Sequence, residues 1–374
     1  MLPSVLCFSH LRWNFVYQRP QHLMSRFAQH GKVYFVEEPI FDKGWQGLKL
    51  SSPIKSLRVI TPHVTSDLAP NERERAIAEM LQGFYNANRI EEYITWYYSP
   101  MALGYSMSLF PLLTVYDCMD ELSSFNFAPP ELKERERTLF QMADVVFTGG
   151  HTLYELKRLQ HGNVYAFPSS IDKSHFEAAR HDLNDPPDQR DIPHPRFGFY
   201  GVLDERINSE LIRELALARP DWHFIMIGPV VKIDPATLPS LSNIHYLGVK
   251  DYKDLPLYLS GWDVAIMPFA LNASTKFISP TKTPEYLAGG KPVISTSISD
   301  VVNDYGKFDL VHIADTAEQF VQAGEYILNN NNREKWLAEV DNYLADNSWD
   351  KTFKQMTEIM SAMLNIKSIK LKAN

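Results

Sequence analysis

A run of residues suited to anion binding occupies positions 277–296, FISPTKTPEYLAGGKPVIST. It contains three residues that favour a helix start: Ser279, Pro280 and Thr281. The free N–H groups of a helix start and the ammonium of Lys282 would together form an anion site. Glu285 follows one turn later, where its carboxylate could accept hydrogen bonds from vicinal sugar hydroxyls. The alternative is an ordinary capped helix with Glu285 in a solvated ion pair.

A second candidate site follows the strand-like run RFGFY at positions 196–200. Gly201 comes directly after this run, and Arg206 follows shortly before a helical pattern. This order places a guanidinium beside the end of a strand, where it could hold a diphosphate. The alternative is a surface Arg206 paired with Glu210 across one helical turn.

Three carboxylates surround the end of another strand-like run, LTVYDC at positions 113–118: Asp117, Asp120 and Glu121. A carboxylate that is partly desolvated and close to another can have a raised pKa and act as a general base on an acceptor hydroxyl. Asp117 or Asp120 would be that base in an inverting reaction, whereas in a retaining one the cluster would only orient the acceptor. The alternative is a helix N-cap cluster. We expect no metal, because no His–carboxylate spacing supports one.

The elements that must position these residues follow from an alternation of short apolar runs with amphipathic helical stretches. Strands are expected at 4–9, 32–36, 57–60, 93–98, 113–116, 145–148 and 164–167, then at 196–202, 223–227, 244–247, 264–268 and 293–296. Helices are expected at 18–29, 71–88, 208–218, 255–260 and 280–288, with several more after 317. This alternation is typical of a parallel, doubly wound sheet.

The alternation stops at residues 177–195, EAARHDLNDPPDQRDIPHP, which contain four prolines and few large apolar side chains. We therefore expect a linker at 171–195 between two Rossmann-like domains, 1–170 and 196–348, followed by a C-terminal helix and basic tail at 349–374. The predicted fold class is α/β, with the two domains facing across a cleft. Open α/β sheets bind ligands outside the carboxyl ends of their strands, where the candidate residues lie.

Composition excludes several classes of protein. The 374 residues are 45% hydrophobic and 22% charged, which excludes wholesale disorder. A net charge of −8 argues against a nucleic-acid partner. Two cysteines, Cys7 and Cys118, cannot form a disulfide framework, so a reduced, cytoplasmic setting is expected. The N-terminus lacks the pattern of a signal peptide, and no run of 18 apolar residues predicts a membrane span.

Together these runs resemble GT-B glycosyltransferases, in particular the large retaining family four, the glycosyl transferases group 1. The most specific match is PTKTPEYLAGGKPVIS at 280–295. The strand–glycine start at 196–201, FIMIGP at 224–229 and the segment at 244–269 fit the same nucleotide-binding domain. FSHLRWNFVYQRP at 8–20 and FPSSIDKSHF at 167–176 fit the acceptor domain and hinge. The resemblance implies a nucleotide-diphosphate sugar as donor.

The family pattern implies a role for each matching residue on the donor side. Glu285 becomes the ribose-binding carboxylate, Thr281 and Lys282 meet the donor phosphates and sugar, and Arg206 takes a diphosphate-binding position. The other implied donor-side residues are Gly201, Gly228, Gly248, Val249, Tyr252, Ser279 and Pro280. Two positions depart from the pattern: Phe277 replaces a glutamate that contacts the transferred sugar, and Val202 replaces an arginine. The donor sugar and the stereochemistry stay open.

In these enzymes the loop after the first strand enters the cleft beneath the diphosphate. The resemblance therefore implies an acceptor side made of His10, Arg12, Trp13, Tyr17 and Glu121. His10 and Arg12 could contact phosphate or acceptor, and aromatic rings such as Trp13 could stack on a sugar face. The alternatives are a buried, hydrogen-bonded His10 and aromatic packing between loop and helix.

The C-terminal residues 349–374 predict an amphipathic helix. Its apolar residues recur at helical spacing, at Phe353, Met356, Ile359, Met360 and Met363, and three lysines follow, Lys367, Lys370 and Lys372. An amphipathic basic end could contact an anionic leaflet, which would suit a lipid-linked acceptor. The alternative is an apolar stripe packed on the protein with solvated lysines.

The expected function is transfer of a sugar from a UDP- or GDP-type donor to a carbohydrate or lipid-linked saccharide acceptor, with retention of configuration. No bound cofactor or metal is expected, and the resemblance implies a role in bacterial surface polysaccharide synthesis. Arg206 and Lys282 would stabilise the leaving diphosphate. Two alternatives use the same nucleotide site: a sugar-nucleotide 2-epimerase of the same architecture, and a non-catalytic sugar-nucleotide-binding protein.

Overall fold

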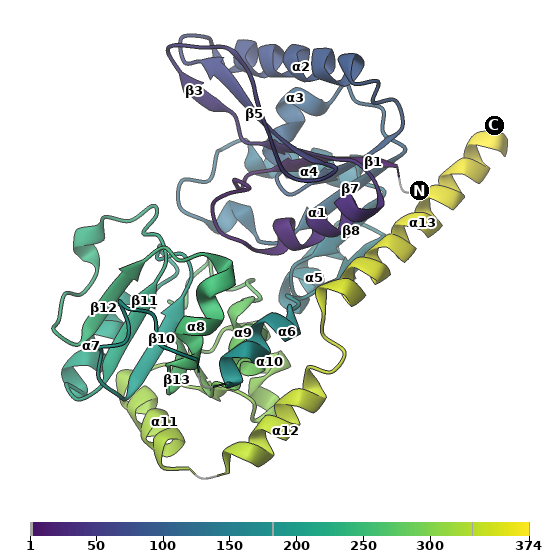
Figure 1. Ribbon diagram of the computed structural model, residues 1–374. Helices are drawn as coiled ribbons and strands as arrows, with labels where there is room; N and C mark the ends of the chain where they lie inside the picture. Colours follow the sequence, from purple (N-terminus) through teal and green to yellow (C-terminus); the bar gives the residue numbers. More distant parts are fainter. Residues whose placement is uncertain (1–2, 182, 331, 374) are drawn as a thin grey trace. The chain divides into compact units, whose positions relative to one another are not determined.

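The computed structural model describes residues 3–181, 183–330 and 332–373, with side chains to residue 369 (Figure 1). The described chain falls into two compact units. Unit 1 takes the described residues of Met1–Ser123, Phe127–Phe167 and Asp350–Asn374. Unit 2 takes those of Ser124–Asn126 and Pro168–Trp349.

Unit 1 is built on a nine-stranded sheet in the order β3-β5-β2-β1-β6-β7-β8-β9, with β4 paired to β5 outside this path. The strands are β1 Ser4–Ser9, β2 Val33–Glu37, β3 Ile40–Asp42, β4 Gly47–Ile54, β5 Leu57–Thr65, β6 Tyr93–Tyr97, β7 Leu113–Cys118, β8 Val145–Thr148 and β9 Val164–Ala166. Its helices are α1 Arg19–His30, α2 Pro70–Ala87, α3 Leu103–Ser106, α4 Leu132–Met142, α5 His151–Lys157 and most of α13 Trp349–Ala373.

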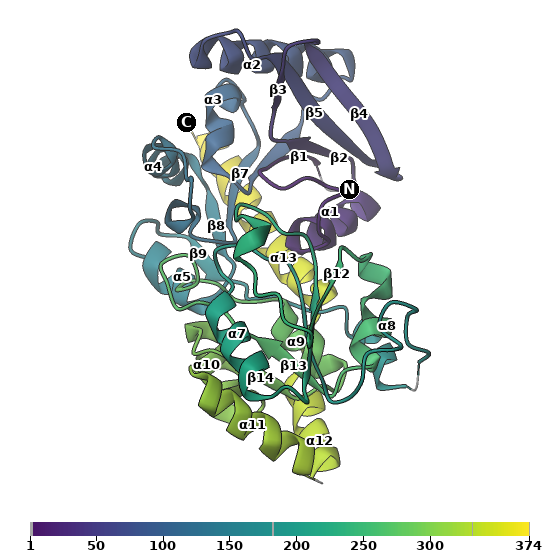
Figure 2. The same ribbon diagram turned by 90° about the vertical axis from the view of Figure 1, so that its left-hand side faces the viewer.

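The strands at the centre of unit 1 are buried along their whole length, as in parallel sheets covered by helices on both faces. All strand pairs in this sheet are parallel except β4 with β5, which form an antiparallel hairpin at the edge (Figure 2). The sequence did not predict β3 or β4. The run GLKLSSPI of β4 is exposed along most of its length, so it carries little hydrophobic pattern.

Unit 2 is built on a six-stranded parallel sheet in the order β12-β11-β10-β13-β14-β15. The strands are β10 Arg196–Tyr200, β11 His223–Ile227, β12 Ile244–Gly248, β13 Val264–Met267, β14 Val293–Ser295 and β15 His312–Ile313. The helices are α6 Lys173–Glu177, α7 Ser209–Ala218, α8 Leu255–Ser260, α9 Lys282–Ala288, α10 Ser299–Asp304, α11 Ala317–Asn329 and α12 Arg333–Tyr343. The prediction of two Rossmann-like α/β domains is confirmed.

The predicted linker, residues 171–195, is packed into unit 2 as far as it is described. Its apolar side chains join the core of that unit: Ile171, Phe176, Ala179 and Ile192. Gln189 is fully buried, accepts a hydrogen bond from Trp262 Nε1 at 3.0 Å and donates one to the Tyr258 carbonyl at 3.0 Å. This segment is therefore not the exposed connection that its prolines and polar residues predicted, because a few apolar residues and satisfied polar groups suffice to anchor it.

The C-terminal helix α13 packs on unit 1 beside α1 (Figure 1). Met356 and Met360 are buried, and the Phe353 ring meets the Phe27 ring edge-on at 4.8 Å. Lys367 Nζ pairs with Asp144 at 2.8 Å. The apolar stripe thus packs on the protein; the side chains of Lys370 and Lys372 lie outside the described part of the structure. Among the helices described, none combines the length and the apolar character of a bilayer span.

Candidate functional site

The sheet of unit 2 reverses its order between β10 and β13, and most predicted donor-side residues lie there. The chain first adds β11 and β12 on one side of β10, then β13 and β14 on the other. In open parallel sheets such a switch point, at the carboxyl ends of the strands, is where ligands bind. Gly201 follows β10, and the segment that leads into α9 follows β13.

Three glycines stand at the carboxyl ends of neighbouring strands in this sheet. Gly201, Gly228 and Gly248 have φ angles of 143°, 139° and 69°, which residues with a side chain rarely adopt. A Cβ on Gly228 would lie 1.9 Å from the Gly201 carbonyl oxygen, and the Gly228 N–H donates to the Gly248 carbonyl at 2.9 Å. Close packing thus requires glycine at Gly201 and Gly228, whereas at Gly248, where a Cβ would meet no atom within 4 Å, only the φ angle favours glycine.

Lys282, the first residue of α9, extends across Gly201. A Cβ on Gly201 would lie 2.2 Å from Lys282 Cε and 2.7 Å from its Nζ. The Nζ atom also lies 5.5 Å from the ring centre of Phe199, in β10, and 6.0 Å from that of Phe269, which lies shortly after β13. The structure therefore holds an ammonium over the end of β10, at the switch point.

Glu285 lies one turn after Lys282 and is 6% exposed. Its Oε2 accepts a hydrogen bond from the Tyr200 hydroxyl at 2.9 Å. Burial raises the pKa of Glu285 to about 7, against the opposing effects of this hydrogen bond and of the Lys282 charge. The Tyr200 N–H in turn donates to the Tyr286 hydroxyl at 2.9 Å. Glu285 is not the solvated surface carboxylate of the alternative interpretation.

Sequence reasoning missed Tyr200 as a partner of Glu285. The two residues are 85 positions apart, and no local pattern connects them. The available signal was position: Tyr200 is the last residue of a strand that ends in a predicted site glycine.

The start of α9 differs from the prediction. The helix begins at Lys282, and its N-cap residue Thr281 makes no side-chain capping hydrogen bond. The Ser279 carbonyl accepts a hydrogen bond from Ser169 Oγ at 2.7 Å, and Ser279 and Pro280 are half-buried. The predicted capping by Ser or Thr therefore does not occur, so Lys282 is the best-placed group for an anion at this end of α9.

Arg206 is held by a neighbour that the sequence did not single out. Its guanidinium forms a two-pronged ion pair with buried Asp204, with Nε–O and Nη2–O distances of 2.9 and 2.7 Å. Glu210, the partner in the alternative interpretation, pairs with Arg213. Arg206 also stacks over the Phe125 ring at 5.4 Å.

Lys232 is a further cation beside Arg206 that the sequence reasoning missed. Its Nζ lies 5.6 Å from the centre of the same Phe125 ring, and its side chain belongs to the loop after β11. One aromatic ring thus gathers two cations from the loops after β10 and β11. A φ of 63° at Lys232 marks the backbone there as unusual, but this is not visible in the sequence.

Tyr252, one of the residues predicted to lie near the nucleobase, forms an aromatic cluster with the segment that was expected to be a linker. The Tyr252 ring stacks on His175 at 4.5 Å, and His175 Nε2 lies 3.0 Å from the Tyr252 carbonyl. Phe176 meets Tyr252 edge-on at 5.6 Å and stacks near Tyr200 at 6.3 Å. Val249 is 60% exposed. His175 and Phe176 of α6 therefore pack against Tyr252 and fix the position of its ring.

The three acidic residues of unit 1 lie in very different surroundings. Asp117 has no exposed surface and pairs with Arg19 at 2.8 Å; burial raises the pKa of Asp117, and Arg19 opposes the shift. Glu121 pairs with Lys157 at 2.6 Å. Burial opposes the change, but hydrogen bonds from Lys157 and Ser123 lower the pKa of Glu121. Asp120 alone is half-exposed.

These contacts correct the predicted roles of two acids. Asp117 serves as a buried partner of Arg19, whose Nη1 also donates to the Phe167 carbonyl at 2.7 Å, and is not an exposed base in this structure. Glu121 faces the buried Lys157, which is shared with Glu136 at 2.8 Å, and is not part of an acceptor surface. Both carboxylates are tied into the interior of unit 1.

The loop after β1 folds back on β2. Arg12 Nη1 donates to Glu37 at 3.1 Å and to the Glu38 carbonyl at 2.6 Å. The Trp13 ring meets Phe35 edge-on at 5.1 Å, and Tyr17 meets His22 edge-on at 4.7 Å. These contacts match the alternative of aromatic packing between loop and neighbouring elements.

His10 is the one predicted acceptor-side residue that lines a described cavity, of about 360 Å³, in unit 1. This cavity lies at the switch point of the first sheet, where β2 and β5 follow on one side of β1 and β6 and β7 on the other. Ser9 ends β1, Glu38 follows β2 and Ser99 follows β6, and all three line it. Arg12, Trp13, Tyr17 and Glu121 do not line this cavity.

Comparisons with known proteins agree with this geometry. The family model of glycosyl transferases group 1 matches residues 194–330, within unit 2. TuaH of Bacillus subtilis (strain 168), named as a candidate teichuronic acid biosynthesis glycosyltransferase, is 26% identical over 283 residues, covering 68% of this chain and 70% of that protein.

Solved structures match nearly the whole chain. Sucrose-phosphate synthase (tll1590) from Thermosynechococcus elongatus is 15% identical with a TM-score of 0.70, covering 98% of this chain and 100% of that one. An E. coli structure titled as trehalose-6-phosphate bound with UDP-2-fluoro glucose is 11% identical with a TM-score of 0.68, covering 96% and 99%. These likenesses show the fold.

Two Rossmann-like domains with a glycine-lined switch point define the class of protein: this is a glycosyltransferase of the GT-B fold. Residues 194–330 match the family model of glycosyl transferases group 1, and the comparisons support a nucleotide-sugar glycosyltransferase. The predicted resemblance, fold and enzyme class are confirmed.

Proposed function

We propose that the chain transfers a sugar from a UDP- or GDP-type donor to a saccharide acceptor in bacterial surface polysaccharide synthesis. The observation that carries the proposal is the pair formed by Lys282, held over the glycine end of β10, and the buried Glu285 one turn away. The name of the TuaH relative, which refers to teichuronic acid biosynthesis, supports the type of pathway.

The two residues suit the two halves of a nucleoside diphosphate. A buried carboxylate can accept hydrogen bonds from both hydroxyls of a ribose, and an ammonium over exposed backbone can neutralise a diphosphate. Negative charge grows on the diphosphate as the bond to the sugar breaks. Lys282 would stabilise that charge where it develops.

Arg206 would act as a second cation, with Asp204 fixing the direction of its guanidinium. Because Asp204 also offsets its charge, we expect Arg206 to contribute less than Lys282. Of the remaining donor-side residues, Gly248, Val249 and Tyr252 would border the nucleobase, and Gly228 would line the donor site.

Retention of configuration is the stereochemical course that we propose. Inversion needs a carboxylate base that can reach an acceptor hydroxyl, and one of the two predicted candidates, Asp117, is paired with Arg19. Asp120 is the base of the alternative, inverting course. The anomeric configuration of the product, read from its proton NMR coupling constants, decides between the two.

The proposed function is tested in two steps. A thermal-shift screen over nucleoside diphosphates should identify one base that raises the melting temperature, because a ligand that binds only the native state stabilises it. The matching nucleotide sugar is then incubated with saccharide acceptors and without any. Release of nucleoside diphosphate that depends on acceptor supports transfer, whereas conversion of the sugar nucleotide without acceptor indicates the epimerase. The same assay with and without EDTA tests the proposed metal independence.

We also propose that the enzyme works at the cytoplasmic face of the membrane on a lipid-linked acceptor. Ile366 and Ile369 near the end of α13 are 45% and 67% exposed and could enter a leaflet. Sedimentation with anionic vesicles tests this contact, and Ile369→Ser should reduce it. If the original protein and Ile369→Ser both stay in the supernatant to the same extent, the proposed membrane contact is contradicted.

A further inference from the structure

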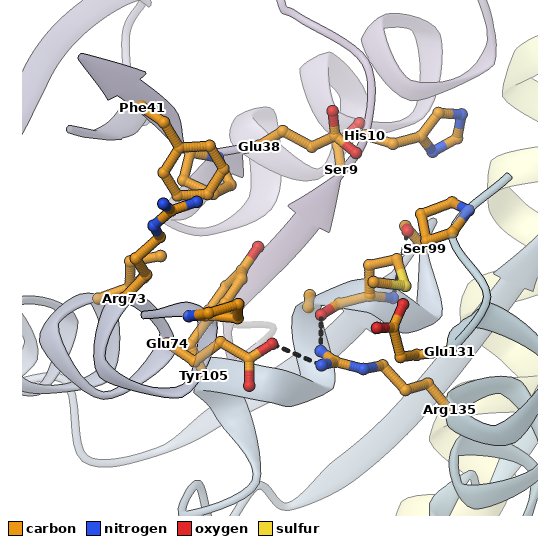
Figure 3. A pocket seen from close by; sticks show the side chains of 16 residues that line it. Ser9, His10, Glu38, Phe41, Arg73, Glu74, Ser99, Tyr105, Glu131 and Arg135 are labelled. Atoms are coloured by element: carbon orange, nitrogen blue, oxygen red, sulfur yellow. Dashed lines mark hydrogen bonds and ion pairs between the residues drawn. The ribbon is translucent and has the colours of Figure 1, made fainter. Parts of the chain in front are cut away.

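Polar contacts fix charged groups at the switch points of both sheets. In unit 1, Arg135 pairs with Glu74 at 2.5 Å and sets one wall of the cavity there (Figure 3). In unit 2, the charged groups are Arg206 and Lys282, and one loop, residues 268–281, leads from β13 to the helix that begins with Lys282. The contacts of this loop therefore bear on the positions of both cations.

The first end of this loop is bound to the backbone of Arg206. The Ala270 N–H donates to the Arg206 carbonyl at 2.7 Å. The side-chain amide of Asn272 donates to the Glu205 carbonyl, one residue earlier, at 3.2 Å. A shift of residues 270–272 would therefore move the backbone that carries the Arg206 guanidinium.

Thr275 closes this part of the loop into a tight turn. Its side chain is buried, and its Oγ1 donates to the Ala270 carbonyl at 2.5 Å and accepts from the Asn272 N–H at 3.0 Å. Asn272 Oδ1 accepts hydrogen bonds in return from the N–H groups of Ser274 and Thr275, at 3.0 and 3.2 Å. One buried hydroxyl thus holds both residues that bind the Arg206 backbone and its neighbour.

The second end of the loop is held at Ser279, shortly before Lys282. The Ser279 carbonyl accepts a hydrogen bond from Ser169 Oγ at 2.7 Å, and the adjacent Ile278 side chain is buried in the core of unit 2. These contacts hold the start of α9, for which Thr281 provides no side-chain cap. The loop is therefore anchored at both ends, with Arg206 beside one end and Lys282 at the other.

We infer that Thr275 is a positioning residue of the donor site, whose hydroxyl holds the loop that sets the spacing between Arg206 and Lys282. The inference rests on the proposed function, since it takes these two cations as the ligands of the donor diphosphate. Two cations held at a fixed spacing bind the two phosphoryl groups with less loss of conformational freedom than two mobile ones. A monophosphate needs only one of the cations, so its binding depends little on their spacing.

The test compares the binding of UDP, GDP, UMP and GMP to the full chain by isothermal titration calorimetry. Thr275→Val replaces the hydroxyl by a methyl group of similar size. We expect the dissociation constant of the nucleoside diphosphate that binds to rise about 10-fold, while that of the matching monophosphate stays within about twofold. An equal rise for both nucleotides, or no rise for either, would overturn the inference.

Further variants separate positioning from a general loss of structure. Thr275→Ser keeps the hydroxyl and should restore diphosphate binding. Thr357→Val is the matched control, because it removes from half-buried Thr357 of α13 a hydroxyl that donates to the Phe353 carbonyl at 2.9 Å, and it should change neither affinity. In an Arg206→Ala background, Thr275→Val should weaken diphosphate binding by less than about twofold, since the group that it positions is gone. Fully additive effects, or no rescue by serine, contradict the inference.

Acceptor-dependent turnover, measured on the same proteins, separates this inference from the proposed function. Turnover and diphosphate binding that are both unaffected by Thr275→Val would leave the transferase proposal standing and refute the role of Thr275. A selective loss of diphosphate affinity in that variant, without turnover of any acceptor by the original protein, would do the reverse. An original protein that binds neither UDP nor GDP would refute both.

Discussion

At the scale of single residues, Lys282 is the group whose loss should be most informative. Lys282→Met keeps the apolar stem over Gly201 and removes the charge that would stabilise the leaving diphosphate. Loss of such a group from a preorganised site costs about 100-fold or more in kcat. We expect that fall in a steady-state transfer assay, with the melting temperature little changed.

Lys276→Met is the matched control for Lys282. Lys276 is exposed, and its Nζ lies 5.2 Å from the ring of Phe277. Its loss should leave kcat within about twofold of the original. An equal fall in both variants would show that general positive charge, and not the position of Lys282, supports turnover.

The buried carboxylate of Glu285 should make stability depend on pH. Because its pKa rises from 4.5 to about 7 on folding, the native state holds a proton that the unfolded state has released between these values. The free energy of unfolding should therefore fall as pH rises from about 4.5 to 7, by up to about 3 kcal/mol from this group. Urea denaturation of the original protein and of Glu285→Gln over this range checks it. The variant should show a flatter profile, and parallel profiles would contradict the assignment.

At the scale of elements, the segment 171–195 stabilises unit 2 through Gln189. Gln189→Leu removes the acceptor of Trp262 Nε1 and the donor to the Tyr258 carbonyl. Leaving buried polar groups unsatisfied costs about 1–3 kcal/mol each. We expect a loss of that order in the free energy of unfolding, measured by chemical denaturation. Gln322→Leu on α11, at an exposed side chain that donates to Glu318 at 3.4 Å, should change it by less than about 0.5 kcal/mol.

The packing of α13 gives a second prediction for an element. Met356 is fully buried against unit 1, so Met356→Ala should lower the free energy of unfolding by about 2–5 kcal/mol. Met107→Ala, at a residue that is 54% exposed, is the control. If both variants melt at the same temperature, α13 is not a structural part of unit 1.

At the scale of the whole molecule, the sequence predicts what is local and periodic. The apolar runs placed β1, β8 and β11 at their observed bounds, since continuous apolar runs are typical of strands buried on both faces. The glycine after a predicted strand and the charged residues at a predicted helix start likewise predicted that Gly201, Lys282 and Glu285 lie at the same end of one sheet.

Contacts between residues far apart in the chain were beyond such reasoning. Arg19 and Asp117 are 98 positions apart, and Arg19 neutralises the acid that looked like a base. The pair of Arg206 with Asp204 was close in sequence but had a competitor in Glu210, and only packing selects between them. Which side chains pair in the core depends on how the folded sheet brings them together, and the order of residues along the chain does not show this.

The anchoring of residues 171–195 also determines how this protein can be cut and recombined. Arg180, in this segment, is held by Asp341 and by the Ala288 carbonyl, so trypsin should find it a poor substrate in the native state. A chimaera that exchanges the donor domain must carry the segment along, from Pro168 to Trp349, and return the chain to unit 1 for α13. Exchange of this domain therefore needs two junctions in the chain, one at each end of the inserted domain, and not one.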